Sequence, residues 1–141
     1  MISTTGEYAL RAAVYLAQHV GEPQTTVIIA EGTKVPAGYL SKILQQMVKA
    51  DLINSQRGLH GGFVLAKPPV EISVLDILRS VDAAPERIHK CPLGIPGHMK
   101  LCQVHRLIDE SMAVIEQSFA KADLDMLSRS ARGVKPLCDE K

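Results

Sequence analysis

The 141-residue chain is 46% hydrophobic, which excludes an intrinsically disordered protein and leaves room for one domain with an appended element. Aromatic residues make up only 4%, which argues against an extensive base-stacking platform for single-stranded nucleic acid. The net charge of +1 indicates no partner by itself: residues 1–70 carry six Lys and Arg against four Asp and Glu, and residues 71–141 carry ten against eleven.

The sequence lacks the signals of membrane insertion and secretion. No apolar run approaches the roughly 18 residues that a membrane-spanning helix needs. Residues 1–7 lack the basic and apolar regions of a signal peptide, so we expect a cytoplasmic protein with no membrane partner. Its three cysteines, Cys91, Cys102 and Cys138, are too few for a disulfide framework and indicate metal binding, redox sensing or no special role.

The N-terminal third predicts three helices. The first begins with a capping box, in which Thr4 is the N-cap and Glu7 follows three residues later. A short second helix covers residues 26–31 and stops at Gly32. The third has Pro36 in its first turn and apolar residues spaced at three and four along its length. Two helices joined by a short connection are typical of a helix-turn-helix.

A β-hairpin is predicted directly after the third helix. Residues 52–53 and 63–65 are apolar, and they flank a polar run at 54–57 and a glycine-rich tip at 58–62. A hairpin in this position is typical of a wing, so the first part of the chain is expected to be a winged helix-turn-helix.

The C-terminal half predicts a short helix, a long loop and a long helix. Ser73 caps the short helix, and Asp76 completes a capping box. Residues 83–101 are rich in proline and glycine and form an irregular loop, a kind of segment that is often functional. The long helix covers about residues 101–122 and presents an apolar seam to a partner helix. The seam consists of Val104, Ile108, Met112, Ile115, Phe119 and Ala122.

The third helix and the hairpin tip carry the candidate DNA contacts. A helix in the major groove needs an exposed polar face, and an arginine among glycines can approach a narrow minor groove. The same residues could form the solvated side of an ordinary amphipathic helix, but the order of helix, turn, helix and basic hairpin favours DNA binding. The candidates are Tyr39, Ser41, Lys42, Gln45, Gln46 and Lys49 on the helix, and Gln56, Arg57 and His60 at the tip.

An enzyme is the contrasting hypothesis. Cys102 and His105 could act as nucleophile and base, but no orienting carboxylate or oxyanion motif accompanies them. We therefore expect no enzyme. A pure interaction protein built from the same helices would lack salt-dependent affinity for DNA.

These segments resemble the Rrf2 family of bacterial winged-helix regulators, which includes IscR, NsrR and CymR. The resemblance covers about residues 1–122, and the hairpin motif is its most specific part. It implies a DNA-binding transcriptional repressor that forms a homodimer through the long helix, with Tyr39, Ser41, Lys42 and Arg57 at the DNA surface. The matching stretches are GEYALR at 6–11, VPAGYL at 35–40, RGLHGGFVL at 57–65, VLDIL at 74–78 and the loop from Cys91 to His105.

The resemblance also implies a sensor in the loop. Many family members hold an iron–sulfur cluster there, generally on three cysteines, whereas this loop has only Cys91 and Cys102. Residues 95–98, which end in His98, stand where a middle cysteine is expected. Substitute ligands are His105, three residues after Cys102, and Glu7, which occupies the place of an acidic ligand that some relatives supply across the dimer. Two thiolates, an imidazole and a carboxylate could complete a two-iron cluster.

The alternatives to a cluster stay open. Glu7 fits the capping box equally well, and His105 could only cap or pack at the helix start. The two cysteines could form a disulfide under oxidant, and a regulator without any cofactor could sense a metabolite or a partner protein. Cys138 falls in the expected tail and is more readily taken as incidental than as a ligand.

The expected fold class is mainly α with a small β-hairpin wing and a long C-terminal dimerisation helix. We predict a winged helix-turn-helix DNA-binding domain over residues 1–82, a sensor loop over 83–101, a dimerisation helix over 102–127 and a tail over 128–141.

Overall fold

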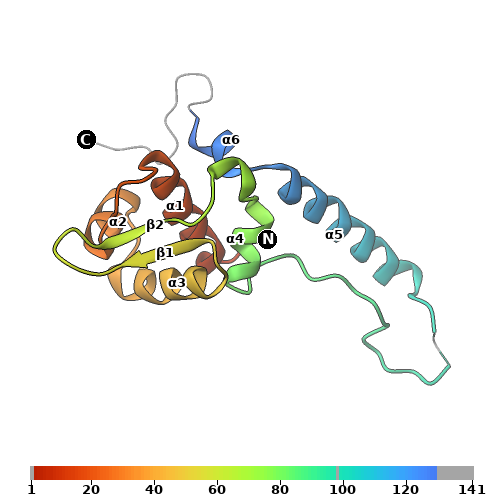
Figure 1. Ribbon diagram of the computed structural model, residues 1–141. Coiled ribbons are helices and arrows are strands. Elements are labelled where there is room, and N and C mark those ends of the chain that lie inside the picture. Colours follow the sequence, from red (N-terminus) through yellow and green to blue (C-terminus); the bar gives the residue numbers. More distant parts are fainter. Residues whose placement is uncertain (1, 98, 130–141) are drawn as a thin grey trace.

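A computed structural model describes residues 2–97 and 99–129, so His98 and Cys138 lie outside the described residues. Figure 1 shows a body of packed helices with a two-stranded hairpin on one side. A long helix and the loop before it project from the opposite side. No described helix is long and apolar enough to cross a membrane.

Helix α1 (Thr4–Gln18) lies at the centre of the body and packs against α2, α3, α4 and α6. The Ser3 hydroxyl caps it by accepting from the Gly6 N–H at 3.2 Å. The predicted capping box is therefore wrong, because the helix begins one residue earlier than expected. The Glu7 N–H already donates to the Ser3 carbonyl at 2.9 Å, and the Glu7 carboxylate forms an ion pair with Arg11 one turn later.

Helices α2 (Thr26–Thr33) and α3 (Ala37–Lys49) form the helix-turn-helix. Gly32 does not stop α2 as predicted but lies inside it. A Cβ at this position would come within 2.3 Å of the Tyr15 ring, so glycine is required by packing. The helix ends instead where Lys34 adopts a left-handed conformation, with φ of 57°. Pro36 is the N-cap of α3 rather than part of its first turn.

The wing consists of β1 (Ile53–Gln56) and β2 (Gly62–Leu65), paired antiparallel with Ile53 opposite Leu65. Its base is fixed to the body because Gln24, between α1 and α2, exchanges two backbone hydrogen bonds with Phe63, at 3.0 and 2.8 Å. A Cβ on Gly62 would come within 2.6 Å of the Gln24 backbone, and its φ of 146° also disfavours other residues.

After the wing, a 3₁₀ turn η1 (Pro69–Glu71) leads into α4 (Val74–Ser80), where the predicted capping box of Ser73 and Asp76 is confirmed. Helix α5 (Gln103–Lys121) has no buried residue, and α6 (Leu124–Ser128) returns to the body. Leu124 is fully buried there, and its N–H donates to the Ile72 carbonyl at 2.9 Å.

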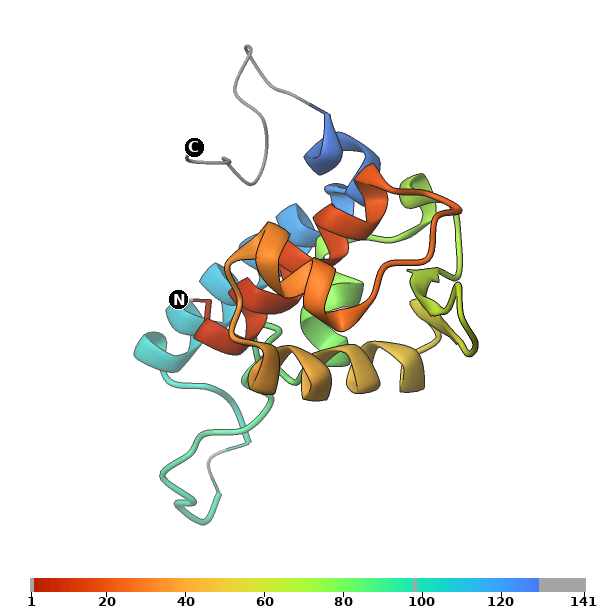
Figure 2. The same ribbon diagram turned by 90° about the vertical axis from the view of Figure 1, so that its left-hand side faces the viewer.

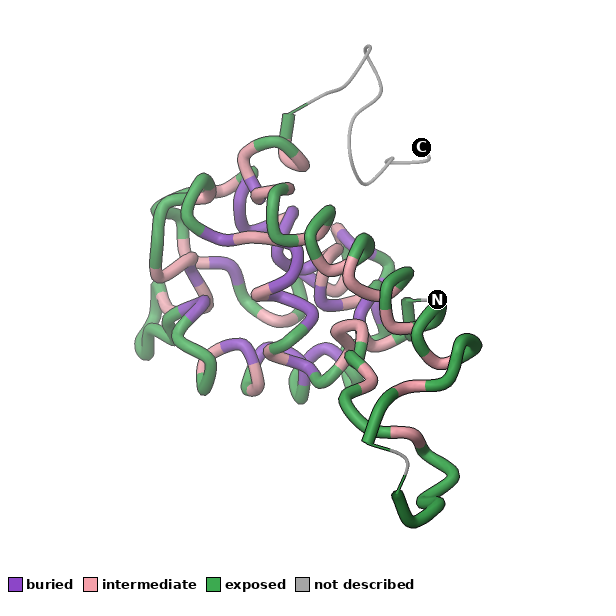
Figure 3. Tube along the Cα trace, turned by 90° about the vertical axis from the view of Figure 1, so that its right-hand side faces the viewer, coloured by how far each residue is buried: buried purple, intermediate pink, exposed green. Residues whose placement is uncertain are grey.

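The core occupies the body alone. In Figure 3 the buried positions gather in the helices of the body, whereas α5 and the preceding loop are half-buried or exposed. The largest fully buried side chains come from α1 to α4, β1, the segment before α4, and α6. They are Leu16, Ile29, Leu40, Leu44, Met47, Ile53, Ile72, Ile77, Leu78 and Leu124.

Candidate DNA interface and sensor loop

Helix α3 turns one face to the core and the opposite face outward. Figure 2 shows it along one side of the body, with the hairpin beyond its C-terminal end. Its apolar residues Leu40, Ile43, Leu44 and Met47 are buried. Positions 38, 42, 45 and 49 follow at steps of four, three and four, so they share the outer face. The outer face thus presents the bare backbone of Gly38, the amide of Gln45 and the ammonium groups of Lys42 and Lys49, all exposed.

The first turn of α3 is held against α1 by aromatic and cationic contacts. Tyr39 is 66% exposed, and its ring meets the edge of the Tyr8 ring at 6.2 Å between centroids. The Arg11 guanidinium lies 5.8 Å from the centroid of the Tyr8 ring and donates to the Thr33 carbonyl at 3.4 Å. Arg11, which the sequence analysis missed, therefore links Glu7 to the turn of the helix-turn-helix. Its only sequence signal is the i, i+4 spacing from Glu7.

Three of the predicted DNA contacts differ in whether their side chains are already hydrogen-bonded within the protein. The Ser41 hydroxyl donates back to the Ala37 carbonyl at 3.2 Å, so it is engaged within α3. Arg57 and His60 are exposed at the wing tip and form no hydrogen bond or ion pair with another described residue. The tip itself is a tight turn closed by a 3.0 Å hydrogen bond from the Gly61 N–H to the Gly58 carbonyl. A defined turn thus presents two side chains that are free to meet a polyanion.

The sensor loop brings three of the four predicted ligands together. Cys91 is half-buried in the loop, Cys102 is the N-cap of α5, and His105 lies in the first turn of α5. The sulfur atoms of Cys91 and Cys102 lie 3.8 and 3.2 Å from His105 Nδ1. Glu7 does not join them, because it lies on α1 and pairs with Arg11. We call Cys91, Cys102 and His105 the thiol–imidazole cluster.

The thiol–imidazole cluster supplies donors of the right chemistry but does not form a finished metal site. Thiolate sulfur and imidazole nitrogen are the protein ligands of zinc and of iron–sulfur clusters. Both sulfurs approach one ring nitrogen, however, and no group of three or more His, Cys, Asp or Glu side chains within 2–97 and 99–129 is arranged to hold a metal ion. A single protomer therefore offers three donors of suitable chemistry that are not arranged around a common metal position.

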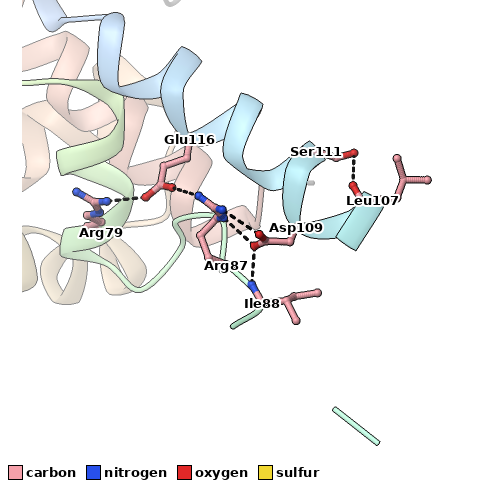
Figure 4. Close-up of polar contacts among 7 residues, drawn as sticks. All are labelled: Arg79, Arg87, Ile88, Leu107, Asp109, Ser111 and Glu116. Atoms are coloured by element: carbon pink, nitrogen blue, oxygen red, sulfur yellow. Dashed lines mark hydrogen bonds and ion pairs between the residues drawn. The ribbon is translucent and has the colours of Figure 1, made fainter. Parts of the chain in front are cut away.

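Four charged side chains connect α4, α5 and the start of the loop (Figure 4). Asp109 accepts from Arg87 Nε and Nη2 at 2.7 and 2.9 Å and from the Ile88 N–H at 2.9 Å. Glu116 accepts from Arg79 at 2.7 Å and lies 3.6 Å from Arg87 Nη1. We call Arg79, Arg87, Asp109 and Glu116 the ionic strap.

The ionic strap shifts the acidity of its central pair. The hydrogen bonds from Arg87 and then from the Ile88 N–H lower the pKa of Asp109 from 3.8 to about 2. The same contact with Asp109 raises the pKa of Arg87. The sequence analysis missed this pair because its members are 22 residues apart and belong to different elements.

Helix α5 leaves an apolar face without cover in the protomer. Val104, Leu107 and Val114 are 65–67% exposed on it. Alongside this face, a groove of about 670 Å³ lies between α5, the segment before α1 and residues 83–85. Its lining includes Ile2 and Pro85, together with the predicted seam residues Met112, Ile115 and Phe119.

Comparisons with known proteins agree with this arrangement. The sequence matches the family described as Rrf2, iron-dependent transcriptional regulator, over residues 2–130. It is 36% identical over 128 residues to the HTH-type transcriptional regulator Rv1287 of Mycobacterium tuberculosis, covering 87% of this chain and 80% of that protein. The structure of IscR from T. potens is similar, with a TM-score of 0.75, 27% identity and coverage of 94% of this chain and 93% of that one.

The oxidized form of CymR from Staphylococcus aureus is similar as well, with a TM-score of 0.74, 26% identity and coverage of 93% of this chain and 98% of that one. The mainly helical fold with a hairpin wing, predicted from the sequence, is confirmed by these structures and by the arrangement of α1 to α4, β1 and β2.

Proposed function

The chain belongs to the Rrf2 family of transcriptional regulators and is a DNA-binding regulator rather than an enzyme, and we propose that it represses transcription as a homodimer on a double-stranded operator. The observation that carries this proposal is the outer face of α3, whose lysines and amide stand beside a free basic wing tip. Such a regulator acts where the chromosome lies, which in bacteria is the cytoplasm.

In the proposed complex, α3 enters the major groove and the wing follows the minor groove. Tyr39 and Gln45 lie where a recognition helix meets base edges, and Lys42 lies where it meets phosphates. Arg57 enters the minor groove, whose negative potential attracts a guanidinium, and His60 lies beside it at the tip. Ser41 contributes a hydroxyl oxygen that remains free to accept, because its proton is donated to Ala37.

The uncovered apolar face of α5 supports the homodimer. A helix with no buried residue and several exposed branched side chains is expected to bury them against a second copy. Two copies related by a twofold axis would place their α3 helices on successive turns of one DNA face, about 34 Å apart. The predicted division of the chain, with dimerisation assigned to residues 102–127, belongs to this proposal.

The regulator would sense its signal through a two-iron iron–sulfur centre bound at the thiol–imidazole cluster. Three of the four protein ligands would be Cys91, Cys102 and His105. The fourth would be Glu7 of a second copy, whose carboxylate would have to leave its ion pair with Arg11 to bind iron. The cluster would supply sensitivity to oxidants and to iron supply, as the family description and the IscR structure suggest. In this candidate mechanism the iron–sulfur cluster is a cofactor of the regulator.

A thiol switch is the second candidate, favoured by the approach of both sulfurs to one imidazole. The His105 ring lies within 4 Å of the sulfur atoms of Cys91 and Cys102, and an imidazole beside a thiol is a typical environment of redox-active cysteines. A structural neighbour is known in an oxidized form. In this version no metal binds, and disulfide formation between the two cysteines changes operator affinity.

Anaerobic purification separates the two candidates. A cluster predicts a coloured protein with about two iron and two sulfide per chain, and Cys91→Ser abolishes both the colour and the response of operator binding to air. Cys138→Ser is the control and leaves both unchanged. A colourless, iron-free protein whose operator binding responds to oxidant only when Cys91 and Cys102 are present supports the thiol switch. Both candidate sensors would be refuted if affinity for the operator did not change with oxidant, with iron supply or on the Cys91→Ser substitution.

A further inference from the structure

Little holds the sensor loop in place beyond its first residues. Between Ile88 and Cys102, the N-cap of α5, the backbone hydrogen bonds of the described residues are two local turns, from Gly94 to Cys91 and from Met99 to Gly97. The described residues 92–97 and 99–100 are exposed. The last point at which the loop is attached to a helix before Cys91 is therefore Arg87 and Ile88, which are bound to Asp109.

The spacing along both segments places this attachment next to the thiol–imidazole cluster. Asp109 lies four residues after His105, one turn farther along the same side of α5. Arg87 lies four residues before Cys91, and three extended residues from Ile88 to Cys91 reach at most about 10 Å. The contact with Asp109 therefore confines Cys91 to the neighbourhood of His105, where its sulfur is found 3.8 Å from Nδ1.

The geometry of the contact distinguishes it from an ordinary surface ion pair. Exposed single pairs hold their partners loosely and contribute little to stability. Asp109 instead receives two guanidinium hydrogen bonds in a bidentate arrangement and a third from a backbone N–H. A planar fork with a main-chain donor fixes direction as well as distance. The carboxylate thus sets the path of the loop backbone, not only the position of one side chain.

The other half of the ionic strap continues this link into the DNA-binding body. Glu116 lies seven residues after Asp109, on the same side of α5, and accepts from Arg79 of α4 at 2.7 Å. Helix α4 packs against α3, the recognition helix. The loop, α5 and α4 are therefore joined by contiguous polar contacts that end one helix away from the DNA surface.

We propose that Asp109 and Arg87 are positioning residues that assemble the thiol–imidazole cluster, and that Glu116 and Arg79 tie the assembled site to α4. The inference rests on the proposed function of Cys91, Cys102 and His105 as the sensor. It adds that two residues outside the donor set decide whether Cys91 lies within reach of Cys102 and His105.

The test measures the proximity of the two thiols directly, in the metal-free full-length chain carrying Cys138→Ser. The protein is equilibrated with glutathione and glutathione disulfide, so that each Cys91–Cys102 disulfide formed reduces one glutathione disulfide to two glutathione. The equilibrium gives the effective concentration of one thiol at the other. The rate of Cys91 alkylation by iodoacetamide is measured in parallel.

Releasing the loop should lower the effective concentration by about tenfold, because the tether that limits the volume open to Cys91 is lost. We expect this from Asp109→Asn and from Arg87→Gln, together with faster alkylation of Cys91, and partial recovery in Asp109→Glu. Asp125→Asn, which breaks the ion pair between Asp125 of α6 and Arg129 at its C-cap, is the matched control and should change neither quantity.

Values for Asp109→Asn and Arg87→Gln equal to those of Asp125→Asn would overturn the inference. The proposed sensor can fail separately. Asp109→Asn and Arg87→Gln could change the effective concentration and the alkylation rate of Cys91 while operator affinity of the parent protein stays the same with oxidant and iron. In that case the positioning role stands and the sensor function is refuted.

Discussion

Replacement of the wing arginine, Arg57→Ala, tests the DNA interface through the salt dependence of binding. Arg57 forms no ion pair with another described residue, so the substitution removes a cation without breaking an interaction that stabilises the fold. A homodimer loses two cations at the DNA. Each displaced phosphate counterion contributes a slope of roughly 0.9 in a plot of log affinity against log salt, so the slope should fall by about 1.8.

The change in slope fixes the size of the effect. Between 50 and 200 mM salt, a slope difference of about 1.8 corresponds to roughly a tenfold change in the ratio of wild-type to variant affinity. Fluorescence anisotropy at four salt concentrations, on a duplex selected in vitro with the wild-type protein, measures it. The control is Arg129→Ala, which removes an exposed arginine at the C-cap of α6, away from α3 and the wing, together with its ion pair to Asp125. Parallel salt lines for wild type and Arg57→Ala would refute the assignment of the wing tip to DNA.

Three further predictions concern the fold, the ionic strap and the dimer. Gly62→Ala should destabilise the protein in urea by on the order of 1–3 kcal/mol, since a Cβ meets the Gln24 backbone, whereas Gly58→Ala, with open space around it, should cost less. The pKa of Asp109 is lower in the folded chain than in the unfolded chain, so its contribution to stability is present above pH 3.8 and is lost as the pH falls through about 2. Asp109→Asn should therefore weaken the decrease in melting temperature at acidic pH, the acid limb, measured by thermal unfolding followed by circular dichroism. Leu107→Asp should convert the proposed dimer to monomer in sedimentation velocity, whereas Gln117→Asp, away from the apolar face of α5, should leave the dimer intact.

Two of these predictions have clear opposing outcomes. An acid limb that is identical in Asp109→Asn and wild type would show that the strap does not stabilise the folded chain. A Leu107→Asp protein that sediments as a dimer would place the interface on another surface.

The sequence was sufficient wherever local periodicity decides the structure. The spacing of Leu40, Ile43, Leu44 and Met47 gave α3 and its buried side, and the glycine-rich run between two short apolar segments gave the wing. The capping box at Ser73 and Asp76 was equally readable, because both of its hydrogen bonds lie within four residues. These features depend on neighbours in the chain, which the sequence displays directly.

Features that depend on packing between distant segments were not predictable in the same way. Gly32 looked like a helix stop, but its role is to make room for Tyr15, which lies on another helix. Glu7 fitted a capping box with Thr4, but the hydroxyl of Ser3 caps the helix instead, and the carboxylate of Glu7 forms an ion pair with Arg11. Local patterns could not decide between such competitors, because the choice depends on which partner the fold brings closer.

The sensor loop shows the same division. The sequence by itself determined that two cysteines and a histidine stand in a proline- and glycine-rich loop before a long amphipathic helix. Only the tertiary structure decided that both sulfurs approach one ring nitrogen, and that Asp109 holds the loop there through Arg87. The physical reason is that a loop without periodicity has no preferred path of its own, so its position is set by the few contacts that α5 and α4 offer it.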